Sequence, residues 1–84
     1  MTRKQFLEIA IPLGYDPHKI VRKKNGTFEL RRSYFYTHGT TQEDWGRWVM
    51  GKLPAGQFEL VETDNSWNAW PKDSYFSAFV KPLA

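Results

Sequence analysis

Hydrophobic residues recur at helical spacing in the first stretch of the chain. Thr2 and Gln5 form a capping-box pattern, in which each side chain can accept a hydrogen bond from the other residue's backbone N–H. The apolar positions that follow at this spacing are Phe6, Ile9, Ala10 and Leu13. We expect a helix that begins at Arg3. It ends near Ala10 or Ile11, because Pro12 cannot donate a backbone hydrogen bond.

A second helical stripe lies in the middle of the chain. Thr40 and Glu43 form another capping-box pattern. The apolar residues that follow recur at i, i+3, i+4 and i+8, and they are Trp45, Trp48, Val49 and Leu53. Pro54 and Gly56 then end the helix. We expect this stripe, including both tryptophans, to pack in the core.

Alternating apolar and polar residues predict strands in the remaining stretches. Two strands run over residues 58–63 and 75–80, and turn residues follow the first of them at 64–66. An earlier pair of strands flanks Asn25-Gly26, the dipeptide typical of a two-residue β-hairpin turn. This turn pairs Arg22 with Glu29 and Val21 with Leu30.

The two-residue turn also decides which side chains share a face of the hairpin. We expect the core face to carry Val21, Phe28, Leu30, Tyr34 and Tyr36. We expect the outer face to carry Ile20, Arg22, Lys24, Glu29, Arg31, Ser33 and Phe35. Arg32 falls on the core face as well. A β-bulge near Arg32 and Ser33 would remove that conflict.

The elements follow the order α-β-β-α-β-β, which indicates an α+β fold. We expect a four-stranded, mostly antiparallel sheet with the two helices packed on one face. The 84 residues make a single small globular domain over residues 1–84. The opposite face of the sheet then lies open to solvent or to a partner.

Charge is distributed unevenly along this domain. Residues 1–36 hold eight Lys and Arg against three acids, a net charge of +5, whereas residues 37–84 hold four against six, a net charge of −2. This asymmetry favours one basic face, although a mixed solvated surface is equally compatible with it.

The basic hairpin is the candidate nucleic-acid site. Lysine and arginine bind phosphates through charge, and arginine also through a bidentate fork. An aromatic ring beside arginine is an arrangement that stacks on bases. The candidate residues are Arg22, Lys23, Lys24, Arg31, Arg32 and Phe35. We expect a small non-enzymatic domain that binds nucleic acid, with DNA and RNA both left open. A solvated edge hairpin is the structural alternative.

A protein partner is the alternative function. Small domains without catalytic motifs are typical of phage and mobile-element accessory proteins, including inhibitors of host nucleases or defence complexes. The hairpin would then dock on an acidic protein surface. The anchors would be Trp67, Trp70 and Tyr75, because aromatic residues are enriched at binding hot spots.

Other classes of function have little support in the sequence. The chain has no cysteine, which excludes disulfides and thiolate metal sites. His18 and His38 have no second histidine or paired acid nearby, so we expect no catalytic residue, no metal and no cofactor. The early apolar run is short and broken by Pro12, so we expect a cytoplasmic protein without signal peptide or membrane contact. The sequence leaves open whether the protein is a monomer or a homodimer.

Overall fold

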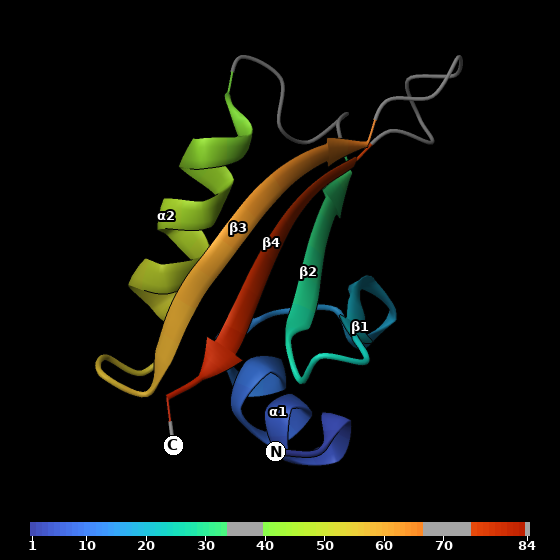
Figure 1. Cartoon of the computed structure of the whole chain (residues 1–84), viewed down its shortest axis with the longest axis vertical. Helices are drawn as coiled ribbons and strands as arrows, with labels where there is room; N and C mark the ends of the chain where they lie inside the picture. The colour runs from blue at the N-terminus through green and yellow to red at the C-terminus, as the bar shows by residue number, and fades with distance from the viewer. Residues whose placement is uncertain (34–39, 67–74, 84) are drawn as a thin grey trace.

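The fold consists of one antiparallel sheet and two α-helices (Figure 1). It is known from a computed structural model, which describes residues 1–33, 40–66 and 75–83. The helices are α1 (Arg3–Ala10) and α2 (Gln42–Lys52), with short 3₁₀ turns at Ile11–Leu13 and Pro17–Lys19. The strands are β1 (Ile20–Arg22), β2 (Phe28–Ser33), β3 (Phe58–Ser66) and β4 (Tyr75–Pro82). Their order across the sheet is β1-β2-β4-β3, and every neighbouring pair is antiparallel.

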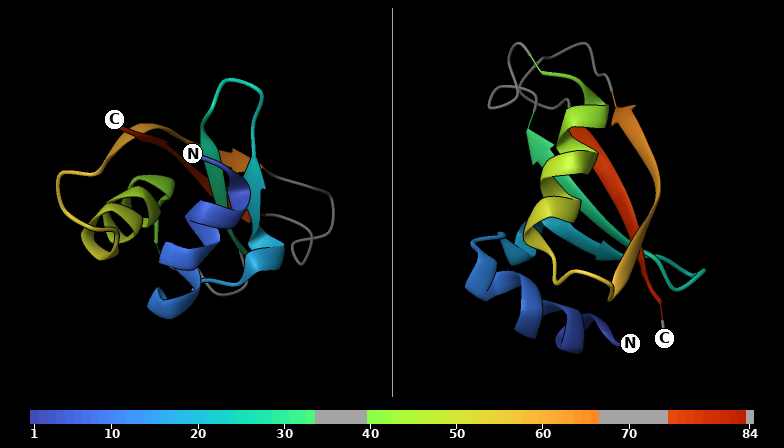
Figure 2. Two further views of the ribbon diagram at one scale, coloured as in Figure 1. Left: turned by 90° about the horizontal axis from the view of Figure 1, so that it is seen from below. Right: turned by 90° about the vertical axis from the view of Figure 1, so that its left-hand side faces the viewer.

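Both helices pack on the same face of the sheet (Figure 2). Phe6 of α1 stacks on Phe28 of β2, with ring centroids 4.3 Å apart. Trp45 of α2 donates its indole N–H to the backbone carbonyl of Leu30, two residues further along the same strand. The predicted α+β architecture is therefore confirmed. No helix among residues 1–33, 40–66 and 75–83 covers the opposite face of the sheet.

Aromatic stacking lies at the centre of the core. Phe6 has no exposed surface, and its ring meets Phe58 edge-on at 5.5 Å in addition to stacking on Phe28. The other buried apolar residues come from every element of the sheet and from both helices. They include Ala10, Ile20, Leu30, Val49, Leu53, Phe76, Ala78 and Val80. One core therefore ties α1, α2 and the sheet together.

The first helix matches its prediction in position and cap. Thr2 and Gln5 form the complete capping box, and α1 ends at Ala10. The second helix begins one residue later than predicted, because its capping box joins Thr41 to Asp44 rather than Thr40 to Glu43. The shorter aspartate side chain serves the same purpose as the expected glutamate, since its Oδ2 accepts from the Thr41 N–H at 3.2 Å.

The core-facing arc of α2 differs from the predicted stripe. Trp45, Val49 and Leu53 are buried as expected, but Trp48 is 45% exposed and Gly46 is buried instead. The side of α2 that carries Gly46 faces β3. The buried face of the helix therefore includes Gly46 beside Trp45 and Val49, and Trp48 lies outside it. The prediction that Trp48 packs in the core is wrong.

Replacing Gly46 with alanine should destabilise the protein by about 1 kcal/mol. An added Cβ would lie 2.7 Å from Thr63 Cγ2 and 3.1 Å from Leu60 Cδ2. This overpacking costs about 1–3 kcal/mol and outweighs the gain of about 1 kcal/mol in helix propensity. Gly51→Ala is the matched control, because nothing lies within 4 Å of its added Cβ, and it should stabilise α2. Urea denaturation of both variants checks the opposite signs. Equal effects would contradict the close approach of α2 to β3.

The β1–β2 hairpin has a three-residue loop rather than the predicted two-residue turn. Lys23 N–H donates to the carbonyl of Thr27 at 2.8 Å, and Gly26 N–H donates to that of Lys23 at 3.2 Å. Gly26 alone in this loop has a positive φ, of 82°, while Asn25 accepts from the Thr27 N–H and hydroxyl. This arrangement is the common three-residue hairpin loop, in which a turn is followed by one residue in the left-handed conformation. The strand register therefore shifts by one residue.

The new register exchanges the faces of β1. Ile20 lies opposite Leu30 and is buried, whereas Val21 lies opposite Glu29 and is only half-buried. The predicted core position of Val21 and outer position of Ile20 are both wrong, because a one-residue slip inverts every side chain of a strand. Arg22 pairs with Phe28, on the helix-facing side.

The remaining strands correct two further expectations. Arg32 keeps its place on the helix-facing side, since β2 pairs regularly with β4 through Ser33 and has no bulge there. The register shift lies in β3 instead, between Leu60 and Glu62. The predicted turn at residues 64–66 is part of β3, because these residues pair with β4 as far as Tyr75. Residues Tyr34 and Tyr36, also assigned to the core face, lie outside the described residues.

Candidate nucleic-acid interface

The five candidate cations of the hairpin occupy three different settings. Arg22 and Lys24 are exposed near the loop. Lys23 and Arg31 flank Glu29 on the open face of the sheet. Arg32 lies on the helix-facing side, beside α2. The expectation that Arg22, Lys24 and Arg31 share one outer face is wrong, because the longer loop changes the register. Phe35 lies outside the described residues.

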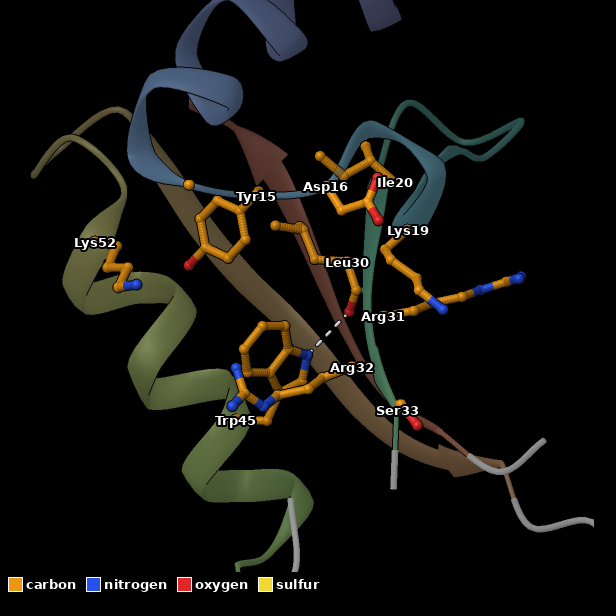
Figure 3. Close-up of a pocket in the computed structure, with 11 residues that line it drawn as sticks. Tyr15, Asp16, Lys19, Ile20, Leu30, Arg31, Arg32, Ser33, Trp45 and Lys52 are labelled. Atoms are coloured by element: carbon orange, nitrogen blue, oxygen red, sulfur yellow. Dashed lines mark hydrogen bonds between the residues drawn. The ribbon is translucent and has the colours of Figure 1, made fainter. Parts of the chain in front are cut away.

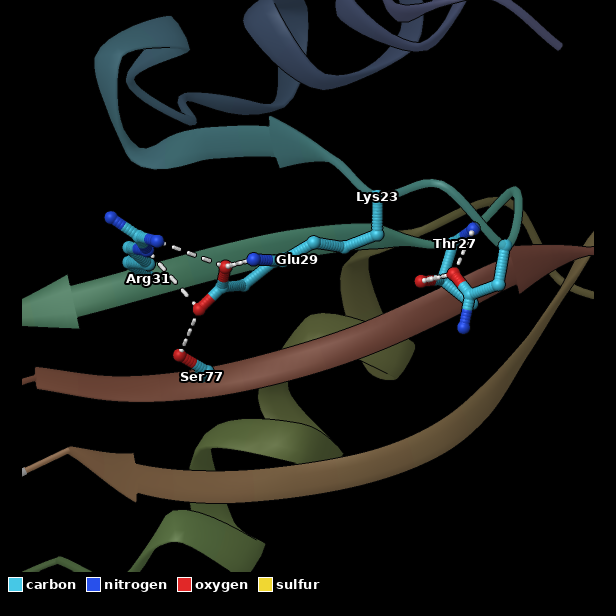
Figure 4. Close-up of polar contacts among 6 residues, drawn as sticks. Lys23, Thr27, Glu29, Arg31 and Ser77 are labelled. Carbon is cyan, nitrogen blue, oxygen red and sulfur yellow. Dashed lines mark hydrogen bonds and ion pairs between the residues drawn. The ribbon is translucent and has the colours of Figure 1, made fainter.

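Glu29 is the centre of a polar cluster on the open face (Figure 4). Its carboxylate is buried, with 4% of the side chain exposed. Lys23 Nζ lies 3.1 Å from Oε1, and Arg31 Nη2 donates to the same oxygen at 3.1 Å. Ser77 of β4 donates its hydroxyl to Oε2 at 2.6 Å. Arg31 Nε lies 3.1 Å from Oε2 as an ion pair, without the angle of a hydrogen bond.

These contacts keep Glu29 charged. Burial by itself raises the pKa of a carboxyl, but the hydrogen bonds from Arg31, Ser77 and Lys23 outweigh burial and hold the pKa of Glu29 below its ordinary value. The same pairing raises the pKa of Arg31. The charge of Glu29 cancels one of the two positive charges of Lys23 and Arg31. The cluster therefore presents a net charge of +1 to an outside ligand.

A cavity of about 290 Å³ opens between the segment before β1, strand β2 and helix α2 (Figure 3). Its buried floor is apolar and consists of Ile20, Leu30 and the ring of Trp45. Charged side chains lie around the opening, and they are Asp16, Lys19, Arg32 and Lys52. Three of these four carry positive charge. Asp16 is the one carboxylate among them, and its Oδ1 accepts a hydrogen bond from the backbone N–H of His18 at 2.9 Å. Arg31 also belongs to the lining, but its side chain lies with Glu29 on the open face of the sheet.

Aromatic rings hold the cations of this cavity in place. The Arg32 guanidinium lies 5.5 Å from the ring centroid of Trp45 and 5.9 Å from that of Trp48. Lys52 Nζ lies 5.7 Å from the ring of Tyr15, which meets Trp45 edge-on. Such contacts between cations and ring faces stabilise the charged group and fix its position.

Tyr15 has an unusual hydroxyl group. The oxygen is buried and has no hydrogen-bond partner among residues 1–33, 40–66 and 75–83. Burial raises the pKa of Tyr15, and the nearby charge of Arg32 opposes this only in part. The phenol is therefore neutral at physiological pH and adds no negative charge to the cavity.

The candidate partner-binding residues divide between described and undescribed parts of the chain. Tyr75 is half-buried on the open face, where the Arg31 guanidinium lies 4.7 Å from its ring centroid. Trp67 and Trp70 lie outside the described residues, as does His38. His18 is exposed at the 3₁₀ turn Pro17–Lys19.

Sequence reasoning missed the cavity and several of its residues. Tyr15 and Lys19 stand far from Lys52 along the chain, and no motif links them. Only the packing of α2 and the segment before β1 against β2 brings them together. The one available signal was Arg32, a charged residue that alternation placed on the core face.

Two other kinds of feature are absent from the described part of the chain. No group of three or more His, Cys, Asp or Glu residues there could hold a metal ion. Among the helices described, none is long and apolar enough to cross a membrane.

Comparisons with known proteins give no relative. No family model matches the chain, and neither curated proteins nor solved structures yield a match.

Proposed function

We propose that this protein binds nucleic acid, through phosphate contacts made by the β1–β2 hairpin and the adjoining cavity. The observation that carries the proposal is that cations outnumber acids in this region. Its two acids are Glu29, which is ion-paired with Lys23 and Arg31, and Asp16 at the cavity. The exposed cations Lys19, Arg22 and Lys24 thus remain available to an outside anion.

Acidic residues at the opposite edge of the sheet also support binding of a polyanion by the hairpin. Strand β3 carries Glu59, Glu62 and Asp64, all exposed. Since β1 and β3 are at opposite edges, the positive and negative charges lie at opposite ends of the sheet. The electrostatic field of this charge distribution turns the basic edge toward a polyanion and the acidic edge away from it.

Replacing the two exposed hairpin cations tests this proposal. In Arg22→Gln with Lys24→Gln, we expect weaker binding of a labelled single strand of about 12 nucleotides and a loss of about 1–2 from the slope of log K against log salt. Fluorescence anisotropy between about 50 and 200 mM salt measures both quantities. Lys23 is left intact, because its removal would also disturb Glu29.

The matched control is Arg47→Gln with Lys81→Gln. It removes the same two charges from the outer side of α2 and from the end of β4, both exposed. If both double variants bind equally, the hairpin has no special part and the proposal fails. If the native protein does not bind at about 100 μM in low salt, where even non-specific association is measurable, a protein partner becomes the better hypothesis.

A further inference from the structure

The cavity beside α2 combines two properties that a surface for phosphate alone would not need. Its floor of Ile20, Leu30 and Trp45 is apolar and buried, whereas three cations and one carboxylate lie around its opening. Free phosphate gains nothing from an apolar floor. A ligand that is flat and apolar at one end and anionic at the other fits both parts.

Arg32 supplies a flat surface at this cavity. Its guanidinium is held near the rings of Trp45 and Trp48, and Trp45 is itself fixed by a 3.0 Å hydrogen bond to the carbonyl of Leu30. Nucleic-acid-binding proteins stack unpaired bases on aromatic rings and on arginine planes alike. A guanidinium held in this way loses little freedom when a base stacks on it.

The cavity is also continuous with the hairpin. It is lined by Lys19, just before β1, by Ile20 at the start of β1 and by residues 30–33 of β2. A strand of nucleic acid whose phosphates lie along the hairpin therefore reaches the opening without leaving the basic surface. Lys19 and Lys52 stand on opposite sides of this opening (Figure 3).

We propose that the cavity binds one unpaired nucleotide of a single strand, with its base against Arg32 and the apolar floor and its phosphate near Lys19 or Lys52. This inference rests on the proposed function, and it adds that the protein prefers single strands to duplexes. A duplex keeps its bases paired and stacked, so it can offer the hairpin only its backbone.

The test compares an intact single-stranded DNA of about 12 nucleotides with an abasic strand of the same length, by fluorescence anisotropy at one salt concentration. Base stacking predicts that the native protein binds the intact strand about tenfold more tightly. Equal binding of both strands would overturn the cavity proposal but leave the phosphate-binding hairpin intact. Binding of neither strand would overturn the proposed function itself.

Arg32→Lys then locates the base. This substitution keeps the positive charge and removes the planar guanidinium. The ratio of the affinities for the intact and the abasic strand should therefore fall toward one, while the affinity for the abasic strand is unchanged. Arg22→Lys is the matched control, since it makes the same change outside the cavity and should keep the preference. A preference retained in Arg32→Lys would overturn the assignment to this cavity. The comparison of strands on the native protein needs no variant, so a folding defect in Arg32→Lys does not remove the test.

Discussion

Phe6→Ala should cost about 3–5 kcal/mol of the free energy of unfolding, the range found when a buried phenylalanine is truncated. Phe6 is fully buried and contacts the rings of both Phe28 and Phe58. It is the larger of the two fully buried residues that α1 contributes to the core, the other being Ala10. The total free energy of unfolding of natural domains is only about 5–15 kcal/mol, and we expect a chain of 84 residues to lie toward the lower end of this range. We therefore expect the variant to be largely unfolded at 37 °C.

Urea denaturation followed by circular dichroism measures this loss. Phe6→Leu should lose less, because leucine refills part of the volume. Val61→Ala is the control on the surface, since Val61 is 50% exposed, and it should change stability by no more than about 0.5 kcal/mol. A loss below about 1 kcal/mol for Phe6→Ala would show that α1 is not part of the cooperative core.

Acid should weaken the fold through Glu29, and this is the second large effect. The pKa of Glu29 is lowered in the folded protein from an ordinary value of 4.5. Its ion pairs therefore contribute their full stability above pH 4.5, and the contribution is lost as the pH falls through the lowered folded value. At neutral pH, Glu29→Ala should cost about 2 kcal/mol, because it leaves the buried Ser77 hydroxyl without its acceptor.

The free energy of unfolding measured from pH 7 to about pH 3 checks this expectation. Glu29→Gln should lose stability at pH 7 and show a shallower acid decline than the native protein. Asp44→Asn is an informative control, because the Thr41 backbone N–H lowers the pKa of Asp44 at a separate site. That variant should keep the part of the decline that belongs to Glu29. Parallel curves for the native protein and Glu29→Gln would refute a role for Glu29 in acid sensitivity.

The parts of this fold that could be predicted from the sequence are local. The cap at Thr2 involves a residue only three positions away, so the sequence places α1 correctly. Asn25-Gly26 located the hairpin, but the dipeptide does not choose between a two-residue turn and a loop in which Gly26 alone is left-handed. That single ambiguity reversed the faces of Ile20 and Val21.

The features that could not be predicted depend on contacts between distant segments. Glu29 is held by Ser77, and Arg32 by two tryptophans of α2. On sequence alone, a charged residue on a core face indicates a defect that a bulge would correct. The structure keeps the residue there, because an arginine can lie on the helix-facing side when aromatic rings receive its guanidinium.

The sheet order also has a kinetic consequence. β2 lies next to β4 at the centre of the sheet, so Phe28 neighbours Val80 although α2 and β3 separate them in the chain. β1 and β2, by contrast, meet across a short loop and can pair from local contacts. Closing the long segment costs chain entropy before any central pair forms. We therefore expect the hairpin to form early and the docking of β4, which delivers Ser77 to Glu29, to occur late. We also expect slower folding than in a helical bundle of this length, because a bundle relies on local contacts.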